Sequence, residues 1–138
     1  MHILVVDHRD SFVYNVVDIL RRLPQLTFEV LPEEELRVEA LPRYDGLILS
    51  PGPGVPAEYP RTREAIRYAV EHALPVLGIC LGHQALAEFF GGELVQLPRP
   101  LHGHASCFVG IDPEDEVVGT IPEGSTIGRY HSWAVKPS

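Results

Sequence analysis

The chain has 138 residues, of which 45% are hydrophobic and 22% are charged, a composition typical of one folded globular domain. Nineteen acidic residues against eleven basic ones give a net charge of −8, which disfavours binding to nucleic acid or to anionic membrane lipids. We therefore expect a single domain over residues 1–138 that binds neither nucleic acid nor a membrane.

The start of the chain shows no targeting signal. The apolar run at residues 3–6 ends at Asp7 and follows no basic segment, so it is too short for a signal peptide or a membrane span. The two cysteines, Cys80 and Cys107, form neither a CxxC motif nor the pattern of a disulfide framework. We expect a cytosolic protein with two free thiols.

The first two thirds of the chain alternate short apolar segments with amphipathic ones. Uninterrupted apolar runs of this kind are typical of parallel strands that are buried on both faces. Apolar residues at i, i+3, i+4 and i+7 predict helices that pack on such a sheet. Strands are predicted at residues 3–6, 27–31, 46–49 and 76–79, and helices after Asp10 or Ser11 up to Pro24, over residues 61–73, and from Leu81 to Gly91.

After Gly92 the helical pattern disappears. Short segments between Pro and Gly residues predict strands or turns at 93–96, 106–111, 116–118, 125–129 and 133–135. We expect them to continue the sheet as an antiparallel or mixed edge. The predicted fold class is α/β, an open and mostly parallel sheet with flanking helices and a mainly β C-terminal part. Its ligand site should lie at the carboxyl ends of the strands.

The segment Gly78-Ile79-Cys80-Leu81-Gly82 has the G-x-nucleophile-x-G pattern of a nucleophile elbow, between a predicted strand and a predicted helix. The glycines permit a tight turn that exposes the central side chain, and free N–H groups at a helix start favour a thiolate and a developing oxyanion. An isolated cysteine at a strand end is otherwise most often a small buried apolar residue. With both glycines in register, the pattern favours Cys80 as a nucleophile.

A second candidate feature is the loop Ser50-Pro51-Gly52-Pro53-Gly54, which follows another predicted strand. Its glycines let backbone N–H groups approach a ligand closely, and its prolines stiffen the loop. Alone, such a segment would more often be a surface turn. Gln84 lies four residues after Cys80 on the same predicted helix face, where it either orients a substrate or is solvated.

Five segments carry a resemblance to a known family: DSFVYN (10–15), LSPGPG (49–54), PVLGICLGHQ (75–84), FGG (90–92) and GRYHS (128–132). Together they resemble the class I (triad-type) glutamine amidotransferases. Within this family they are most similar to the small subunit of anthranilate synthase and the glutaminase subunit of aminodeoxychorismate synthase. The resemblance covers nearly the whole chain, in the family order.

The resemblance implies a reaction and a role for each matching residue. Cys80 would attack the side-chain amide of L-glutamine to give a glutamyl thioester and ammonia, while the backbone N–H groups of Gly52 and Leu81 hold the oxyanion. No cofactor is implied. The residues that would bind the substrate are Gly54, Gln84 and, through their backbone, Ser132 and Trp133.

The same resemblance implies a protein partner. Ammonia would pass to a chorismate-using synthase subunit, either anthranilate synthase component I, for tryptophan biosynthesis, or aminodeoxychorismate synthase component I, for folate biosynthesis. The expected function is therefore that of a glutaminase subunit in a two-subunit synthase.

One part of the family pattern is not matched. The family completes its triad with a His and a Glu in a His-Pro-Glu-Ser motif, which does not occur in residues 1–138, and neither His83 nor His131 lies at the family's base position. Because such a base contributes about 10²–10⁴-fold to the rate, we expect this chain to bind glutamine better than it turns it over. Two alternatives stay open: a non-catalytic binding or regulatory module, and a cysteine hydrolase with a different substrate.

The remaining candidate features favour structural roles. His102 and His104 have the spacing of a ligand pair, but no third ligand accompanies them, so no metal site is predicted. Cys107 lies in a predicted strand and is expected in the core. The acidic runs at residues 33–35 and 112–116 are expected to be solvated faces.

Overall fold

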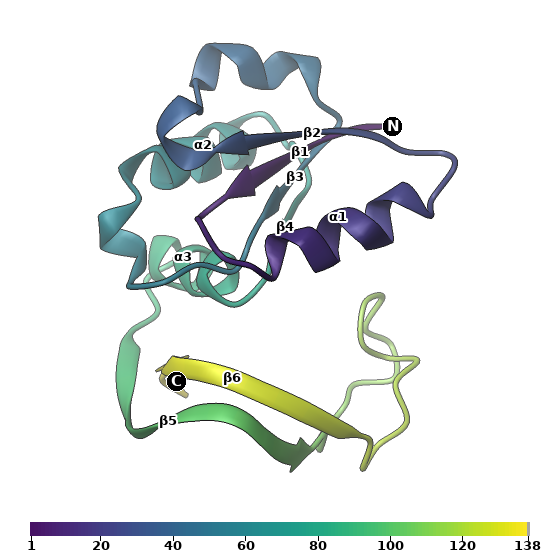
Figure 1. Cartoon of the computed structure of the whole chain (residues 1–138), viewed down its shortest axis with the longest axis vertical. Helices are drawn as coiled ribbons and strands as arrows, with labels where there is room; N and C mark the ends of the chain where they lie inside the picture. Colours follow the sequence, from purple (N-terminus) through teal and green to yellow (C-terminus); the bar gives the residue numbers. More distant parts are fainter. Residues whose placement is uncertain (138) are drawn as a thin grey trace. The chain divides into compact units, whose positions relative to one another are not determined.

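Figure 1 shows the computed structural model, which describes residues 1–137 in two compact units. One unit comprises Met1–Leu94 and the residues from Val135 onward, and the other comprises Val95–Ala134. The second unit consists mainly of β5 (Leu94–Cys107) and β6 (Thr126–Val135). The first contains β1 (His2–Asp7), α1 (Val13–Arg21), β2 (Thr27–Pro32), β3 (Gly46–Leu49), α2 (Pro60–Glu71), β4 (Val76–Gly78), α3 (Leu81–Phe89) and the 3-10 helices η1 (Glu33–Glu35), η2 (Val38–Arg43) and η3 (Pro56–Glu58).

The first unit is built on a four-stranded parallel sheet with the strand order β2-β1-β3-β4. Val5 of β1 pairs with Val30 of β2 and with Ile48 of β3, and Ile48 in turn pairs with Leu77 of β4. All four residues of the central strand β3 are buried, as its uninterrupted apolar run predicts. The predicted α/β class with a parallel sheet and flanking helices is confirmed.

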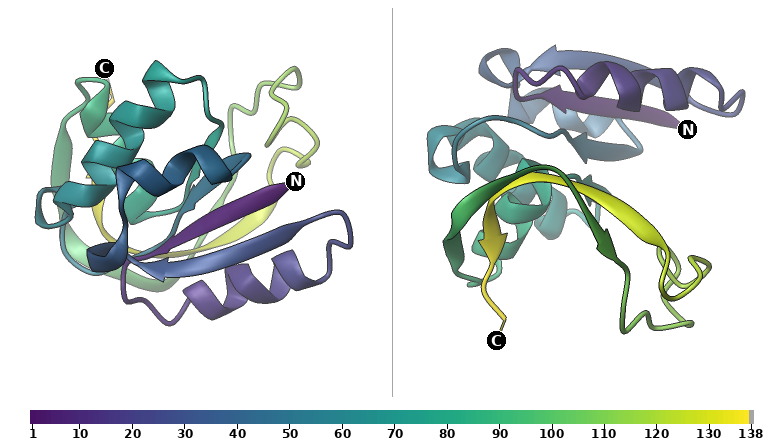
Figure 2. Two further views of the ribbon diagram at one scale, coloured as in Figure 1. Left: turned by 90° about the horizontal axis from the view of Figure 1, so that it is seen from above. Right: turned by 60° about the horizontal axis from the view of Figure 1, so that its bottom comes forward.

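Helices cover both faces of this sheet, α1 on one side and α2 and α3 on the other (Figure 2). Successive residues of a strand point to opposite faces. Val5 accordingly belongs to the apolar cluster that includes Val17 of α1, whereas Leu4 belongs to the cluster that includes Ile66 of α2 and Ala85 of α3. An apolar core on each face therefore holds the sheet in place. The sheet in turn positions the loops at the carboxyl ends of its strands.

The acidic segment at residues 33–35 folds as η1, and it is solvated only in part. Glu34 and Glu35 are exposed as expected, but Glu33 is only 7% exposed. The Glu33 Oε1 atom accepts the backbone N–H of Thr62, in the first turn of α2, at 3.0 Å. A carboxylate is stabilised there because the first N–H groups of a helix have no partner within the helix.

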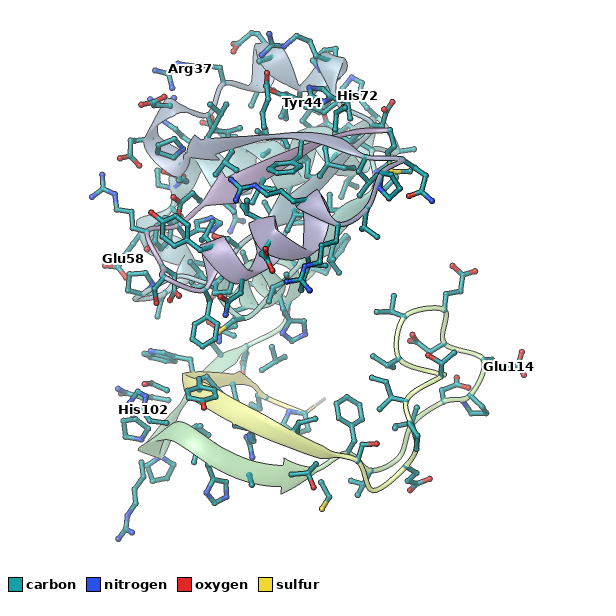
Figure 3. All side chains as sticks on the ribbon, turned by 45° about the vertical axis from the view of Figure 1, so that its right-hand side comes forward. Arg37, Tyr44, Glu58, His72, His102 and Glu114 are labelled. Carbon is teal, nitrogen blue, oxygen red and sulfur yellow. The ribbon has the colours of Figure 1, made fainter. Side chains whose placement is uncertain are left out.

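The C-terminal segments do not extend the main sheet, so that expectation is wrong. β5 and β6 form a separate two-stranded hairpin with a loop between them (Figure 1). The segment predicted at 93–96 lies almost wholly in β5, those at 125–129 and 133–135 lie almost wholly in β6, most of 106–111 follows the end of β5, and 116–118 forms turns in the loop. Pro98 and Pro100 do not end β5, because residues two apart place their missing N–H groups on the same edge of a strand, and a two-stranded sheet leaves one edge of each strand unpaired. The second acidic run lies exposed in the loop after β5, where Figure 3 labels Glu114, as expected.

No helix among residues 1–137 is both long enough and apolar enough to cross a membrane.

Candidate active site

Cys80 lies at the turn between β4 and α3, in an unusual backbone conformation. Its φ of 52° and ψ of −105° place it in a region that side-chain-bearing residues rarely adopt. A strained residue at a strand-to-helix turn is the geometry of a nucleophile elbow. The turn predicted from the Gly-x-Cys-x-Gly pattern is therefore present.

Both glycines of this pattern are required by close backbone approach. A Cβ atom on Gly78 would lie 2.6 Å from the backbone carbonyl of Gly82, across the turn. A Cβ atom on Gly82 would overlap the carbonyl oxygen of Leu49, at the end of β3. The elbow can thus form against the neighbouring strand only if both positions lack a side chain.

The loop at residues 50–54 lies beside this elbow. The backbone N–H of Ile79 donates to the carbonyl oxygen of Leu49 at 2.9 Å, which joins the end of β3 to the start of the elbow. A Cβ atom on Gly52 would lie 2.6 Å from the Leu81 side chain, so these two residues are in contact. The backbone N–H of Gly52 donates to no other backbone group within residues 1–137. The structure thus brings Gly52, Cys80 and Leu81 together at the carboxyl ends of β3 and β4.

The Cys80 thiol is partly buried, and this burial raises its pKa above the ordinary value. A hydrogen bond from the backbone of Leu81 lowers the pKa, and the negative charge of Asp10 raises it, but desolvation is the largest effect. No histidine within residues 1–137 is among the groups that shift this pKa. The sulfur is therefore a protonated thiol at neutral pH, although it lies at the start of a helix.

Two further residues that the resemblance assigns to substrate binding, Gly54 and Gln84, lie in the loop at residues 50–54 and in α3. Gln84 is only 6% exposed, which argues against the solvated alternative, and its backbone N–H donates to the Cys80 carbonyl at 2.9 Å. Gly54 has a φ of 74°, and the Glu58 carboxylate fills the space where a Cβ atom would lie. That carboxylate accepts the backbone N–H of Val55 at 2.8 Å and so fixes the end of the loop.

Ser132 and Trp133 lie on β6, in the second unit. The Trp133 carbonyl accepts a hydrogen bond from Nδ1 of His131 at 2.7 Å, and Nε2 of the same ring accepts one from Arg129 Nε at 3.1 Å. Nδ1 is the donor to Trp133, since a carbonyl oxygen can only accept. The expected contacts of Ser132 and Trp133 with a substrate stay predictions.

The structure also shows where three groups outside the candidate site lie: Cys107, the pair His102 and His104, and His8. Cys107 is exposed at the end of β5, so its predicted core position is wrong; both cysteines are free. Within residues 1–137, His102, His104 and the other His, Cys, Asp and Glu side chains form no group of three that could hold a metal ion. The sequence analysis did not single out His8, which is completely buried. Its only signal in the sequence was that it directly follows a buried strand, at the carboxyl edge of the sheet.

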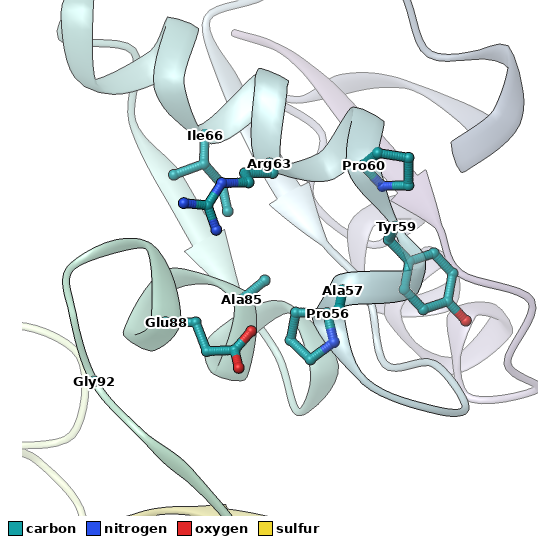
Figure 4. A pocket seen from close by; sticks show the side chains of 9 residues that line it. All are labelled: Pro56, Ala57, Tyr59, Pro60, Arg63, Ile66, Ala85, Glu88 and Gly92. Carbon is teal, nitrogen blue, oxygen red and sulfur yellow. The ribbon is translucent and has the colours of Figure 1, made fainter.

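A separate pocket of about 440 Å³ lies between η3, α2 and α3 (Figure 4). Its walls include Pro56 of η3, Arg63 and Ile66 of α2, and Ala85 and Glu88 of α3. None of the residues that the resemblance assigns to catalysis or substrate binding lines this pocket.

The family model of the class-I glutamine amidotransferases matches residues 4–138. The parallel sheet and the cysteine elbow agree with this match. The chain belongs to the class-I glutamine amidotransferase family.

Curated relatives support the same family, and a solved structure supports the fold. Anthranilate synthase component 2 of Mycobacterium tuberculosis is 36% identical over 99% of this chain, which spans 60% of that protein's length. An aminodeoxychorismate synthase of Streptomyces griseus is 39% identical over 98% of this chain and 19% of its own. A glutamine amidotransferase from Thermotoga maritima, solved by crystallography, has a TM-score of 0.79 at 19% identity, covering 99% of this chain and 62% of its own; at this identity it supports the fold alone.

Proposed function

We propose that this chain acts as a glutaminase component that hydrolyses L-glutamine and supplies ammonia to a chorismate-using synthase subunit. The observation that carries the proposal is the strained Cys80 elbow, held by two obligatory glycines against the loop that contains Gly52. Relatives named anthranilate synthase component 2 and aminodeoxychorismate synthase support a partner of this kind. The anthranilate and aminodeoxychorismate partners are both proposals, as are a cytosolic location and a single-domain organisation.

In the proposed reaction the Cys80 sulfur forms a bond to the side-chain amide carbon of glutamine and gives up its proton to a base. The N–H groups of Gly52 and Leu81 stabilise the negative charge that develops on the amide oxygen. The C–N bond then breaks, and the departing nitrogen takes a proton and leaves as ammonia. Water hydrolyses the thioester to glutamate and regenerates the thiol.

The family resemblance supports a role in substrate binding for four further residues. We assign the α-amino and carboxylate end of glutamine to Gln84 and to the backbone of Ser132 and Trp133, with Gly54 in the wall of the pocket. The loop between Ser50 and Gly54 keeps the oxyanion donor rigid because its two prolines restrict the backbone.

A second candidate function is a binding or regulatory module that holds glutamine without efficient turnover. The observation that favours it is the raised pKa of Cys80, to which no histidine of residues 1–137 contributes. Without a base the thiol stays protonated, and a protonated thiol is a poor nucleophile.

One experiment separates the two functions. Glutamate release from glutamine is measured with the purified chain, with and without a chorismate-using synthase subunit from the same organism and chorismate. The glutaminase predicts release that depends on Cys80, lost in Cys80→Ser and retained in the matched variant Cys107→Ser. Glutamine binding by calorimetry with no glutamate release in any combination supports the binding module instead. Identification of the aromatic product as anthranilate or aminodeoxychorismate assigns the partner.

A further inference from the structure

His8 is a buried histidine that connects three elements next to the candidate site. It follows β1 directly and has no solvent exposure. Its backbone N–H donates to Ser50 Oγ at 3.0 Å, and its ring Nδ1 lies 3.1 Å from the Ser50 carbonyl oxygen and 3.0 Å from Ser50 Oγ. Its Nε2 lies 2.8 Å from the hydroxyl of Thr62, in the first turn of α2. One side chain thus links β1, the loop after β3 and helix α2.

The partners of His8 define its protonation state. A backbone carbonyl only accepts, so Nδ1 carries the proton and donates it toward Ser50, and Nε2 of the neutral ring accepts the Thr62 hydroxyl. Burial lowers the pKa of His8 to about 4, even though the hydrogen bond to Ser50 and the charge of Asp7 both raise it. Near neutral pH the His8 ring is therefore uncharged, and each of its two nitrogens has a hydrogen-bond partner.

The loop at residues 50–54 rests directly on this histidine. A Cβ atom on Gly52 would overlap the Cβ atom of His8 and lie 3.0 Å from the His8 carbonyl oxygen. The Tyr59 ring packs edge-on against the imidazole with ring centroids 4.9 Å apart, and the Tyr59 hydroxyl donates to the Pro53 carbonyl at 2.8 Å. The loop is held at Ser50 by the histidine and at Pro53 by the tyrosine, with Gly52 between them.

We propose that His8 is a positioning residue, which holds the loop at residues 50–54 so that the Gly52 N–H stays beside Cys80 and Leu81. This inference rests on the proposed function, in which Gly52 stabilises the oxyanion. His8 does not touch the reacting sulfur; it acts on the reaction through the loop. A donor that moves by a fraction of an ångström loses much of its effect on the transition state, while substrate affinity depends on other contacts.

The test compares two substitutions at His8 with a matched histidine elsewhere. His8→Leu removes both hydrogen bonds of the ring. His8→Asn keeps a donor close to the place of Nδ1 and so can still bind the Ser50 carbonyl. His72→Ala is the control, because His72 is an exposed histidine at the end of α2.

Two measurements are made on each variant. The first is hydrogen–deuterium exchange of the 50–54 segment by mass spectrometry, which needs no catalytic activity. The second is kcat and KM for glutamine, with the synthase subunit present. We expect His8→Leu to speed exchange in this segment and not in β3, and to lower kcat by about 10-fold or more with KM changed by less than about threefold. His8→Asn should recover most of both properties, and His72→Ala should match the original chain.

The outcomes separate this inference from the proposed function. Absence of turnover in the original chain overturns the proposed function, and the exchange measurement still decides whether His8 holds the loop. The inference is overturned if His8→Leu leaves exchange of the loop unchanged, if it speeds exchange throughout the first unit, or if His8→Asn behaves like His8→Leu.

Discussion

At the scale of single residues, the environment of the two cysteines predicts different reactivity. Cys107 is exposed at a strand end, whereas burial raises the pKa of the Cys80 thiol. A small general reagent such as iodoacetamide reacts with exposed thiolate. We therefore expect iodoacetamide at pH 7.5 to label Cys107 before Cys80.

A reagent shaped like the proposed substrate should reverse this preference. A glutamine-derived chloroketone would place its electrophilic carbon at the elbow by binding first, so we expect it to label Cys80 first and free glutamine to protect that thiol. Peptide mass spectrometry measures both reactions. Labelling of Cys107 alone by the glutamine analogue would exclude Cys80 as the substrate-facing nucleophile.

His8 predicts a pH dependence of stability whose sign follows from its lowered pKa. Its pKa is about 4 in the folded chain and 6.5 as a free group, so between these values the unfolded state binds more protons. The stability that it contributes is complete above pH 6.5 and is lost as the pH falls toward 4, up to about 3 kcal/mol at 1.36 kcal/mol per pKa unit.

Other groups packed around His8 titrate or carry charge, so a variant is needed to isolate its effect. Asp7 precedes it in β1, Glu33 of η1 holds the backbone of its partner Thr62, and the ring of Tyr59 packs on it. Urea denaturation of the original chain and of His8→Asn, at pH 7 and pH 4.5, should show a smaller loss of stability on acidification in the variant. An equal loss in both would assign the acid sensitivity to the carboxylates.

At the scale of elements, the junction of β3, β4 and α3 depends on glycine. A Cβ atom at Gly82 would overlap the Leu49 carbonyl, so we expect Gly82→Ala to cost about 1–3 kcal/mol of stability and to prevent labelling of Cys80 by the glutamine analogue. Gly91 has a φ of 89° with open space around its Cβ position, so Gly91→Ala should cost about 1–2 kcal/mol from backbone strain alone and leave labelling intact. Denaturation and labelling of both variants distinguish a crowded elbow from general strain.

Substitutions on α3 and on α2 should differ in their effect on glutamine binding. Gln84 is buried one turn after Cys80, whereas Glu71 is exposed at the end of α2. We expect Gln84→Ala to weaken glutamine binding in a calorimetric titration and Glu71→Ala to leave it unchanged. Equal affinities would remove Gln84 from the proposed pocket.

Sequence patterns predicted the first unit well because its elements are set by local, strongly apolar runs. The centre of β1, residues 3–6, and residues 47–49 of β3 are continuous aliphatic runs. The elbow between Gly78 and Gly82 is fixed by backbone contacts that only glycine allows. The burial of Glu33 in η1 was not predicted, because it depends on a hydrogen bond with Thr62, a residue distant in the sequence. His8 was missed for the same reason, since its role depends on Ser50 and Thr62, which only the fold brings to it.

The second unit was predicted less well because its pattern carries conflicting local signals. Pro98, Pro100 and Gly103 interrupt a sequence that nevertheless forms one strand, and pairing with β6 decides the outcome. Cys107 was placed in a core on the assumption that its strand joined the main sheet. It lies in a two-stranded hairpin instead, where most side chains of β5 remain exposed.

At the scale of the whole molecule, the sheet of the first unit has an open edge at β4. This strand has three residues and pairs only with β3 within the part of the chain that the structure describes. Leu77 lies beside Ile48 on the face covered by α1, but it is 47% exposed, whereas Ile48 is buried. An unpaired strand edge with an exposed aliphatic side chain is a surface on which another strand can pair.

We therefore expect residues 1–138 to associate through β4, either with one another or with a partner subunit. Leu77→Lys should weaken this association, because it replaces an apolar contact with a charge at the open edge. Val70→Lys is the matched control, since Val70 is 50% exposed on α2 and the substitution adds the same charge. Sedimentation velocity over a range of concentrations should show association of the original chain and of Val70→Lys, and a shift toward monomer for Leu77→Lys. If the original chain and both variants stay monomeric at high concentration, the β4 edge is protected without a partner. If all three associate equally, the contact lies elsewhere on the surface.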